Sequence, residues 1–377
     1  MKVIHVLPSI ADESSGPTYY MVHLAEALLS AGVNAELHTL FPLPQFTVEP
    51  RFPIVGYPRH DRFNLGLSYE MKRGLDIASQ SAEIVHNNSL WMMPNIYSYQ
   101  AARKNGCKIV TSPHGTLSSW ALNHRRWKKR IFGFFMQYPA LRKTDLFHAT
   151  CEKEYHEIRE AGYRQPVAVI PIGMELPDLV NTGQHDSSRM RRIVYFGRLH
   201  AVKGIDRLLL AWNQAYLDGW EVIIAGPDGG ALDALQNLVA QKHIPNVSFV
   251  GEINGKAKYS FLADADICVL PSSTENFGVT VAEALASGTP VIASQGTPWK
   301  GLERERCGRW IPIGIEPLVV ALREMMALSD DERATMGARG RAWIQRDFSW
   351  ESIGFQMKLA YEWLLGRGDC PPFVRVE

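Results

Sequence analysis

The sequence lacks the features that mark several classes of protein. Its five cysteines form no CxxC pair and no cysteine–histidine spacing, so neither a disulfide framework nor a zinc site is indicated. There is no run of about 20 apolar residues, the length that a membrane-spanning helix needs. The amino-terminal MKVIHVLPSI also lacks the apolar segment and cleavage site of a signal peptide. We therefore expect a cytoplasmic protein that does not span a membrane.

Strong charge of either sign is missing as well. The chain has 40 lysines and arginines and 39 aspartates and glutamates, a formal net charge of +1. So small an imbalance gives no reason to propose a nucleic-acid partner. A well-placed GxGxxG motif after a predicted strand is absent, which disfavours a dehydrogenase, and no lysine stands out as a site for a pyridoxal cofactor.

Short apolar segments alternate with helical patterns along the whole chain. The first half contains the strand-like KVIHVLP, AELHTLF, AEIVHNN, CKIVT, LFHATCEKE and AVIPIG, and the second half contains IVYFGRL, EVIIAGP, VSFVGEI, ICVLPSS and PVIAS. Such alternation predicts βαβ units on a parallel sheet. The expected fold class is therefore α/β, with two doubly wound, Rossmann-like domains facing a cleft.

A polar segment between the two halves marks the expected domain boundary. The 377 residues exceed the roughly 100–200 of a typical domain. PIGMELPDLVNTGQHDSSRMRR interrupts the alternation with proline, glycine and polar residues. We predict an amino-terminal domain over 1–175 and a carboxy-terminal domain over 176–355, with the last helix, about 356–377, crossing back to the first domain.

The stretch STENFGVTVAEALASGTPVIAS carries two glutamates, Glu275 and Glu283. It follows the nearly uninterrupted apolar run ADICVLP, which is the form expected of a central parallel strand. Ligands of such sheets bind beyond the carboxyl ends of the strands. The next helix is expected to begin near Phe277, so free backbone N–H groups of Phe277, Gly278 and Val279 would suit a phosphate.

Three other segments offer candidate functional residues. In FGRLHAVKG, Arg198 and Lys203 would neutralise a diphosphate leaving group without any metal. Gly16, at the first strand-to-helix turn, would let a phosphate or sugar approach the backbone. His114, in SPHGTLSSWAL after a predicted strand, would hydrogen-bond a sugar hydroxyl or stabilise charge near the anomeric carbon.

Together, FGRL…KG, the glutamate pair, PHG and the early glycine turn resemble the retaining, nucleotide-sugar-dependent glycosyltransferases of the GT4 family, which have the GT-B architecture. The resemblance covers almost the whole chain. It implies that the carboxy-terminal domain binds the donor and the amino-terminal domain mainly the acceptor. It also implies that no cofactor and no metal are needed, with the acceptor proton passing to the departing phosphate in a front-face, oxocarbenium-like reaction.

The resemblance also assigns roles to individual residues. Arg198 and Lys203 would bind the diphosphate, Glu275 the transferred sugar and Glu283 the ribose. His114 would lie beside the sugar and complete a catalytic set with Arg198, Lys203 and Glu275. The implied donor-binding residues are Gly16, Arg198, Lys203, Glu275, Asn276, Phe277, Gly278, Val279 and Glu283.

Two segments depart from the family pattern. The early turn commonly carries paired glycines, whereas this chain has Ser15, Gly16 and Pro17. The strand between the domains commonly ends in Pro-Asn-Gly, whereas here Ile172 stands between the proline and the glycine. Neither departure affects the charged groups.

Within the family, HGTLSSWAL followed by a basic helix is similar to bacterial enzymes that assemble O-antigen, capsule or other exopolysaccharides on a lipid carrier. The basic run is HRRWKKR, residues 124–130, and IFGFFMQY follows it. Basic and aromatic residues on one helix suit an anionic membrane surface. We expect a glycan or polyprenyl-diphosphate-linked acceptor and a peripheral contact with the cytoplasmic face of the inner membrane, unless 124–130 is only a solvated helix face. As an alternative to a membrane contact, Phe134, Phe135 and Tyr138 could simply be core residues.

Other interpretations stay open from the sequence. Glu275 and Glu283 could be surface charges, Arg198 and Lys203 a solvated pair, and His114 a structural histidine. A sugar-nucleotide epimerase would use the same architecture, and a non-catalytic two-domain protein would close on a ligand without chemistry. For the transferase we favour a UDP-linked hexose or N-acetylhexosamine over GDP-mannose.

Overall fold

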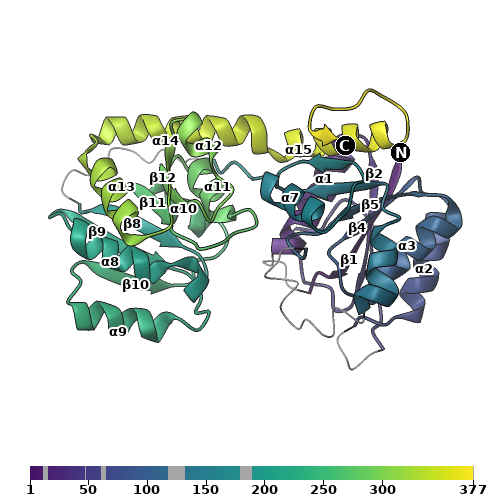
Figure 1. Cartoon of the computed structure of the whole chain (residues 1–377), viewed down its shortest axis with the longest axis horizontal. Coiled ribbons are helices and arrows are strands. Elements are labelled where there is room, and N and C mark those ends of the chain that lie inside the picture. Colours follow the sequence, from purple (N-terminus) through teal and green to yellow (C-terminus); the bar gives the residue numbers. More distant parts are fainter. Residues whose placement is uncertain (12–15, 47, 61–64, 118–131, 179–188, 377) are drawn as a thin grey trace. The chain divides into compact units, whose positions relative to one another are not determined.

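The chain forms two compact units, one of which contains both ends of the sequence. A computed structural model describes residues 1–11, 16–46, 48–60, 65–117, 132–178 and 189–376. The first unit is Met1–Gly173 with Trp350–Glu377, and the second is Met174–Ser349. Each is built on a mostly parallel sheet with helices packed on it, which confirms the α/β, doubly wound class (Figure 1). The units divide a few residues before the predicted boundaries at 175/176 and 355/356.

The first unit has an eight-stranded sheet in the order β14-β7-β6-β5-β4-β1-β2-β3. All neighbours are parallel except β14, which pairs antiparallel with β7 at one edge. Sequence patterns predicted most of these strands but missed the short β3 and β14. The strands are β1 (Lys2–Ser9), β2 (Asn34–Leu40), β3 (Ile54–Tyr57), β4 (Ile84–Asn88), β5 (Lys108–Ser112), β6 (Leu146–Ala149), β7 (Val167–Val169) and β14 (Val374–Arg375).

Helices cover both faces of this sheet, because successive side chains of a strand point to opposite faces. Val3 and Leu7 of β1 pack with α1 and α15, whereas Ile4 and Val6 pack with α2 and α3 on the other face (Figure 1). The helical segments are α1 (Gly16–Ser30), α2 (Tyr69–Ser79), α3 (Met93–Asn105), the π-helix η1 (Gly133–Gln137), α6 (Tyr138–Leu141), α7 (Glu152–Glu160) and α15 (Trp350–Leu364).

Helix α15 belongs to the first unit, and it begins and ends earlier than the helix expected over about 356–377. Small residues allow its close packing: a Cβ added to Gly354 would lie 2.7 Å from the Cβ of Ala27 on α1. The ring of Trp350 likewise leaves no room for a Cβ at Gly173, the last residue of the first stretch of this unit. Tyr361 is fully buried and contacts the sheet through its hydroxyl. The carboxy-terminal segment is therefore part of the core.

The second unit has a six-stranded parallel sheet in the order β10-β9-β8-β11-β12-β13. This order places β8 and β11 side by side at the centre of the sheet. Its residues are buried and apolar along the central strands, as in other parallel sheets. The strands are β8 (Arg191–Phe196), β9 (Trp220–Ala225), β10 (Val247–Gly251), β11 (Ile267–Leu270), β12 (Val291–Ser294) and β13 (Gly308–Ile311), the last of which the sequence patterns missed.

The helices of the second unit pack in two groups. Helix α8 packs against α13, whereas α11 packs against α10 and α14 (Figure 1). The helical segments are the 3-10 turn η2 (Ala201–Lys203), α8 (Ile205–Ala215), α9 (Leu232–Lys242), α10 (Ala257–Ala263), α11 (Val279–Ala286), α12 (Gly301–Arg304), α13 (Ile315–Ala327) and α14 (Asp330–Phe348). No helix among the described residues is long and apolar enough to cross a bilayer.

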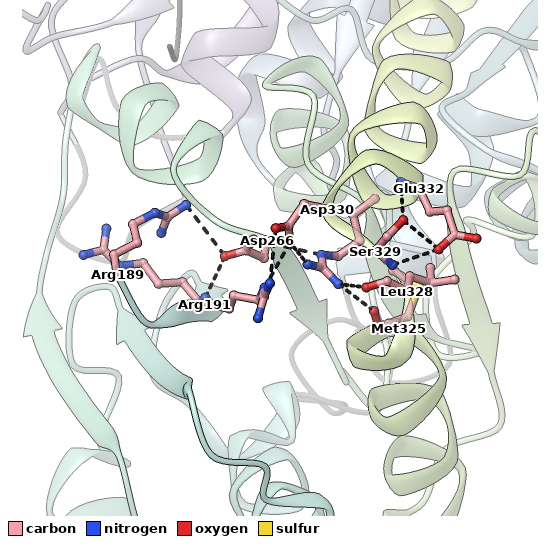
Figure 2. A network of polar contacts seen from close by, with 10 residues as sticks. Arg189, Arg191, Asp266, Met325, Leu328, Ser329, Asp330 and Glu332 are labelled. Carbon is pink, nitrogen blue, oxygen red and sulfur yellow. Dashed lines mark hydrogen bonds and ion pairs between the residues drawn. The ribbon is translucent and has the colours of Figure 1, made fainter. Parts of the chain in front are cut away.

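A polar network ties the amino ends of β8 and β11 to the start of α14. Asp266, just before β11, accepts a hydrogen bond from the Arg192 backbone N–H at 2.8 Å and forms an ion pair with Arg189. Arg191 pairs with Asp330, the first residue of α14 (Figure 2). Buried Arg333 lies over the ring of Trp220 at 5.0 Å. This network stabilises the amino ends of the central strands, whereas the candidate ligand-binding residues follow the carboxyl ends.

The segment after the basic run corrects one sequence interpretation. Phe134 and Phe135 in η1 are 71% and 72% exposed, so the alternative that they are core residues is wrong. Their rings pack edge to face with centroids 5.1 Å apart. Gln137, which is fully buried, anchors η1 by accepting a hydrogen bond from the Trp91 N–H at 2.9 Å. The basic run itself, 124–130, lies outside the described residues.

Candidate active site

Glu275 lies in the loop between β11 and α11, where the sequence placed it. Its backbone N–H donates to the Gly296 carbonyl at 2.8 Å, which fixes the loop against the end of β12. The Ser272 hydroxyl donates to Glu275 Oε1 at 2.7 Å. The side chain is only 13% exposed. The carboxylate is therefore held in one orientation near the carboxyl end of a central strand.

Lys203 forms an ion pair with Glu275, with 2.6 Å between Nζ and Oε1. The lysine ends η2, a turn that begins after His200 and is capped by the His200 side chain. A backbone hydrogen bond of 2.8 Å from Ser273 N to the Val202 carbonyl joins this turn to the loop of Glu275. The structure thus brings together two residues that stand 72 positions apart in the sequence.

Arg198 lies two residues beyond the end of β8 and is exposed. Its backbone carbonyl accepts a hydrogen bond from the hydroxyl of Tyr195 at 3.0 Å. A Cβ added to Gly229 would lie 2.8 Å from the Arg198 Cγ, so the aliphatic part of the arginine rests against that glycine. Arg198 is thus anchored just beyond the carboxyl end of β8, in the same unit as Lys203 and Glu275.

Helix α11 begins at Val279, two residues later than expected from the sequence. Gly278 precedes it in the left-handed conformation, with φ of 76°, which a residue with a side chain rarely adopts. The Phe277 ring is buried, and its carbonyl accepts a hydrogen bond from Trp299 Nε1 at 2.5 Å. Thr280 donates to the Phe196 carbonyl at 3.1 Å. The helix start is therefore joined to the end of β8.

The second glutamate of the pair has a partner that the sequence did not reveal. Glu283, on α11, is buried, and its Oε1 lies 2.6 Å from Nζ of Lys258 on α10. Lys258 occurs in GEINGKAKYSF, a segment with no recognised motif. No signal in the sequence distinguished it from Lys256, since both are ordinary helix-start lysines. Asn276 is half-buried between Glu275 and Phe277.

His114 lies in the first unit, after β5, and has a strained backbone with φ of 51°. Its Nε2 is 3.3 Å from Asn88 Oδ1, and its ring meets the ring of Tyr20 edge to face at 4.9 Å. Burial lowers the pKa of His114 to about 4, so the imidazole is neutral at pH 7. Such a residue can hydrogen-bond a substrate but does not supply a positive charge.

The loop of His114 is anchored by a buried carboxylate that sequence reasoning missed. Glu154 accepts hydrogen bonds from the N–H of Gly115 at 2.7 Å and from the N–H of Thr150 at 2.7 Å. It is fully buried at the start of α7. The available signal was the acidic segment TCEKE after a strand-like run, because acidic residues in the first turn of a helix commonly bind free backbone N–H groups.

A chain of neutral histidines runs beneath that loop. His148 Nε2 lies 2.8 Å from the Ile170 carbonyl, which only accepts, so Nε2 carries the hydrogen. His148 Nδ1 then accepts from the Ser112 hydroxyl at 2.7 Å, and Ser112 accepts from His86 Nε2 at 2.6 Å. His86 Nδ1 finally accepts from the Tyr361 hydroxyl at 2.6 Å. Burial lowers the pKa of His86 and His148, which is consistent with this neutral chain.

Gly16 is the first residue of α1 and also belongs to the first unit. The residues before it, 12–15, lie outside the described residues, so its turn is not part of the observed geometry. Arg198, Lys203, Glu275, Glu283 and the start of α11 all belong to the second unit. Arg198, Lys203 and Glu275 thus lie in segments that follow the carboxyl ends of β8 and β11, whereas Glu283 lies within α11, and Gly16 and His114 belong to the other unit.

Comparison with known families agrees with this arrangement. The family model described as "Glycosyltransferase Family 4" matches residues 14–176, and the model described as "Glycosyl transferases group 1" matches residues 184–343. Together they account for most of the chain. The protein belongs to the GT4-type glycosyltransferases and has the GT-B fold.

Curated relatives match parts of the chain. An uncharacterised 41.2 kDa protein in the cps region of Klebsiella pneumoniae is 22% identical over 56% of this chain and 60% of its own. A GDP-mannose-dependent monoacylated alpha-(1-6)-phosphatidylinositol monomannoside mannosyltransferase of Corynebacterium glutamicum is 27% identical over 67% of this chain and 70% of its own. The chain thus spans 60% to 70% of the length of these relatives.

Solved structures share the fold. The Anabaena protein Alr3699/HepE in complex with UDP superposes with a TM-score of 0.77 and 18% identity, over 96% of this chain and 99% of that one. The lipopolysaccharide outer core galactosyltransferase WaaB superposes with a TM-score of 0.71 and 16% identity, with the same coverage of both chains. At these identities the likeness establishes the fold alone.

Proposed function

We propose that this glycosyltransferase takes its sugar from a nucleoside diphosphate sugar bound in the second unit. The observation that carries the proposal is the grouping of Arg198, Lys203 and the start of α11 at the carboxyl ends of two adjacent central strands, with Glu275 in ion-pair contact with Lys203. Two cations and free backbone N–H groups suit an anionic diphosphate. In this proposal Glu275 binds the transferred sugar and Glu283 the ribose, and the loop and helix start are contributed by Asn276, Phe277, Gly278 and Val279.

The proposed chemistry retains the configuration at the anomeric carbon. The bond from that carbon to the diphosphate oxygen breaks, and a new bond to the acceptor oxygen forms on the same face. The acceptor proton passes to the departing diphosphate. Arg198 and Lys203 stabilise the charge that develops on the leaving group, which is the role that the proposed metal-independent, cofactor-free reaction requires.

His114 of the first unit is proposed to hydrogen-bond the substrate as a neutral imidazole. Its pKa of about 4 excludes it as a cation at pH 7, so its contribution is orientation. Gly16 is proposed to let the donor approach the start of α1. The donor base is proposed to be uracil, supported by the UDP in the similar Anabaena structure, with GDP-mannose as the alternative that the Corynebacterium relative suggests.

We further propose a role in bacterial surface polysaccharide synthesis, with a glycan or polyprenyl-diphosphate-linked acceptor. The names of two similar proteins, one from a cps region and one a lipopolysaccharide galactosyltransferase, support this role. A peripheral contact with the cytoplasmic face of the membrane is part of the proposal. The exposed Phe134 and Phe135, which follow the basic sequence at 124–130, are suited to the boundary between headgroups and acyl chains.

Transfer assays with UDP-glucose, UDP-N-acetylglucosamine, UDP-galactose and GDP-mannose test the donor. Lys203→Met should lower the turnover with the active donor by about a hundredfold or more, because it removes a charge from the leaving-group site. Lys242→Met, an exposed lysine on α9, is the matched control and should leave turnover unchanged. An unchanged rate for Lys203→Met would refute its assigned role.

NMR of the reaction product reports the configuration at the anomeric carbon. A new nucleotide sugar formed without acceptor would favour the epimerase.

Co-sedimentation with vesicles containing anionic phospholipid tests the membrane contact. Replacing Phe134 and Phe135 with serine should weaken binding, because two apolar side chains no longer enter the interface. Phe355→Ser is the control, since that phenylalanine is 55% exposed on α15. Equal binding of all three proteins would rule out the phenylalanines as the anchor.

A further inference from the structure

The ion pair between Glu283 and Lys258 joins two helices of the second unit. The Glu283 side chain is 9% exposed and that of Lys258 22%, with 2.6 Å between Oε1 and Nζ. A carboxylate at this depth requires a compensating charge, because an unpaired buried charge is strongly destabilising. Burial, and then the Glu283 charge, raise the pKa of the Cys268 thiol on β11 to about 12. The carboxylate thus lies close to the central strand.

Helix α10, which carries Lys258, is fixed relative to α11 by hydrogen bonds. Its Leu262 carbonyl accepts a hydrogen bond from the Thr289 hydroxyl at 2.5 Å. Thr289 lies just beyond α11 and donates its N–H to the Ala284 carbonyl at 2.9 Å. The Lys258 ammonium also lies 4.8 Å from the centre of the Tyr259 ring. Thr289 therefore links the two helices that carry Lys258 and Glu283, which keeps the two side chains opposite each other.

We infer that Lys258 is a positioning residue, which holds the Glu283 carboxylate in the orientation that accepts hydrogen bonds from the donor ribose. The inference rests on the proposed function, which assigns the ribose to Glu283. Lys258 binds one carboxylate oxygen and thereby fixes the plane of the group. It also compensates the charge, so a ligand needs to bring only neutral hydroxyl donors. The pair therefore favours a ribose over a deoxyribose, because a missing hydroxyl leaves a desolvated carboxylate oxygen without its donor.

Calorimetric titration of the full chain with UDP and GDP, and with their 2′-deoxy and 3′-deoxy analogues, tests this inference. We expect the wild type to bind the ribonucleotide about tenfold more tightly than the deoxy analogue that lacks the contacted hydroxyl, as for a hydrogen bond to a charged group. Lys258→Met should reduce this preference to about twofold, because the carboxylate loses its fixed orientation. Lys258→Arg, which keeps the charge, should retain most of the preference. Lys242→Met should retain all of it.

The controls separate failure of the inference from failure of the proposed function. Glu283→Gln should abolish the preference for ribose, and thermal unfolding verifies that every variant is folded. If Glu283→Gln abolishes the preference and Lys258→Met leaves it at the wild-type value, the positioning role is overturned and the ribose assignment stands. If the wild type binds nucleotides without any such preference, or binds neither UDP nor GDP, both are overturned. Lys258→Gln replaces Lys258→Met if the latter does not fold.

Discussion

Lys203 and Glu275 compensate each other's charge at side-chain exposures of 20% and 13%. Removing either partner leaves the other partly buried and uncompensated, whereas removing both leaves no charge. We therefore expect Lys203→Met and Glu275→Gln each to lower the free energy of unfolding by about 1–3 kcal/mol, between the values for exposed and fully buried pairs. The double variant should lose less than the sum. Urea unfolding of the four proteins measures this coupling, and simple additivity would show that the contact contributes nothing.

His5 offers a second test at the level of a single residue. The side chain is fully buried in β1, and neither ring nitrogen has a hydrogen-bond partner in the described structure. Such an orphaned polar group costs about 1–3 kcal/mol. His5→Leu should therefore raise the thermal unfolding midpoint. A lower midpoint, together with intact folding, would indicate that the ring has a partner or a packing role.

The same residue makes stability depend on pH. Burial lowers the pKa of His5 from 6.5 to about 3, so the unfolded chain binds a proton at pH values where the folded chain does not. Above pH 6.5 His5 is neutral in both states and does not change the free energy of unfolding with pH. As the pH falls from about 6.5 toward 3, the free energy of unfolding decreases by up to about 1.4 kcal/mol per pH unit. The free energy of unfolding of His5→Leu should fall less steeply between pH 6.5 and 4 than that of the wild type. Identical slopes would contradict this assignment.

Sequence reasoning found the charged candidates but not the lysine that pairs with Glu283. Glu275, Arg198 and Lys203 follow recognisable strands, and their place beyond strand ends follows from the rules of parallel sheets. Lys258 has no such signal, since its role depends on the packing of α10 against α11. The sequence also could not show whether the His5 ring has a hydrogen-bond partner, because a histidine inside an apolar strand gives the same pattern in either case.

At the level of elements, the docking of α15 on α1 depends on small residues. Gly354 leaves no room for a side chain, with the Cβ of Ala27 only 2.7 Å from an added Cβ. Gly354→Leu should separate the two helices and lower the free energy of unfolding by about 3 kcal/mol or more. Phe355→Leu, on the exposed side of the same helix, is the control and should change little. Thermal unfolding distinguishes them, and equal midpoints would show that the helices are not held by this contact.

The elements that the sequence patterns missed share a physical reason. Strands β3, β13 and β14 lie at sheet edges and have four, four and two residues, too short to display a clear period. The buried strands β1, β8 and β11 were predicted because their apolar runs are continuous. The start of α11 was placed two residues early, since the left-handed Gly278 is a detail of the backbone that spacing does not reveal.

For the whole molecule, the two units differ in connectivity, because one is a single stretch of chain and the other consists of two separate stretches. The second unit is one continuous stretch whose ends meet, with Met174 N donating to the Phe348 carbonyl at 2.6 Å. The first unit needs Trp350–Glu377 for its core. A fragment of residues 174–349 should therefore unfold cooperatively, whereas a fragment of residues 1–173 should not fold stably. Circular dichroism during thermal unfolding checks both, and a cooperative transition for 1–173 would contradict the structural role of α15.

The central claim is that the second unit binds a nucleoside diphosphate sugar through Arg198, Lys203 and the start of α11. Thermal unfolding of the full chain with UDP-, GDP-, ADP- and dTDP-sugars tests it most directly, because a ligand that binds the native state raises its stability by about 2.7 kcal/mol at a hundred times its Kd. The account predicts that one class of nucleotide sugar raises the midpoint of the wild type and does so much less for Arg198→Ala. A wild type that responds to none of the four, or an Arg198→Ala variant that responds as strongly as the wild type, would contradict it.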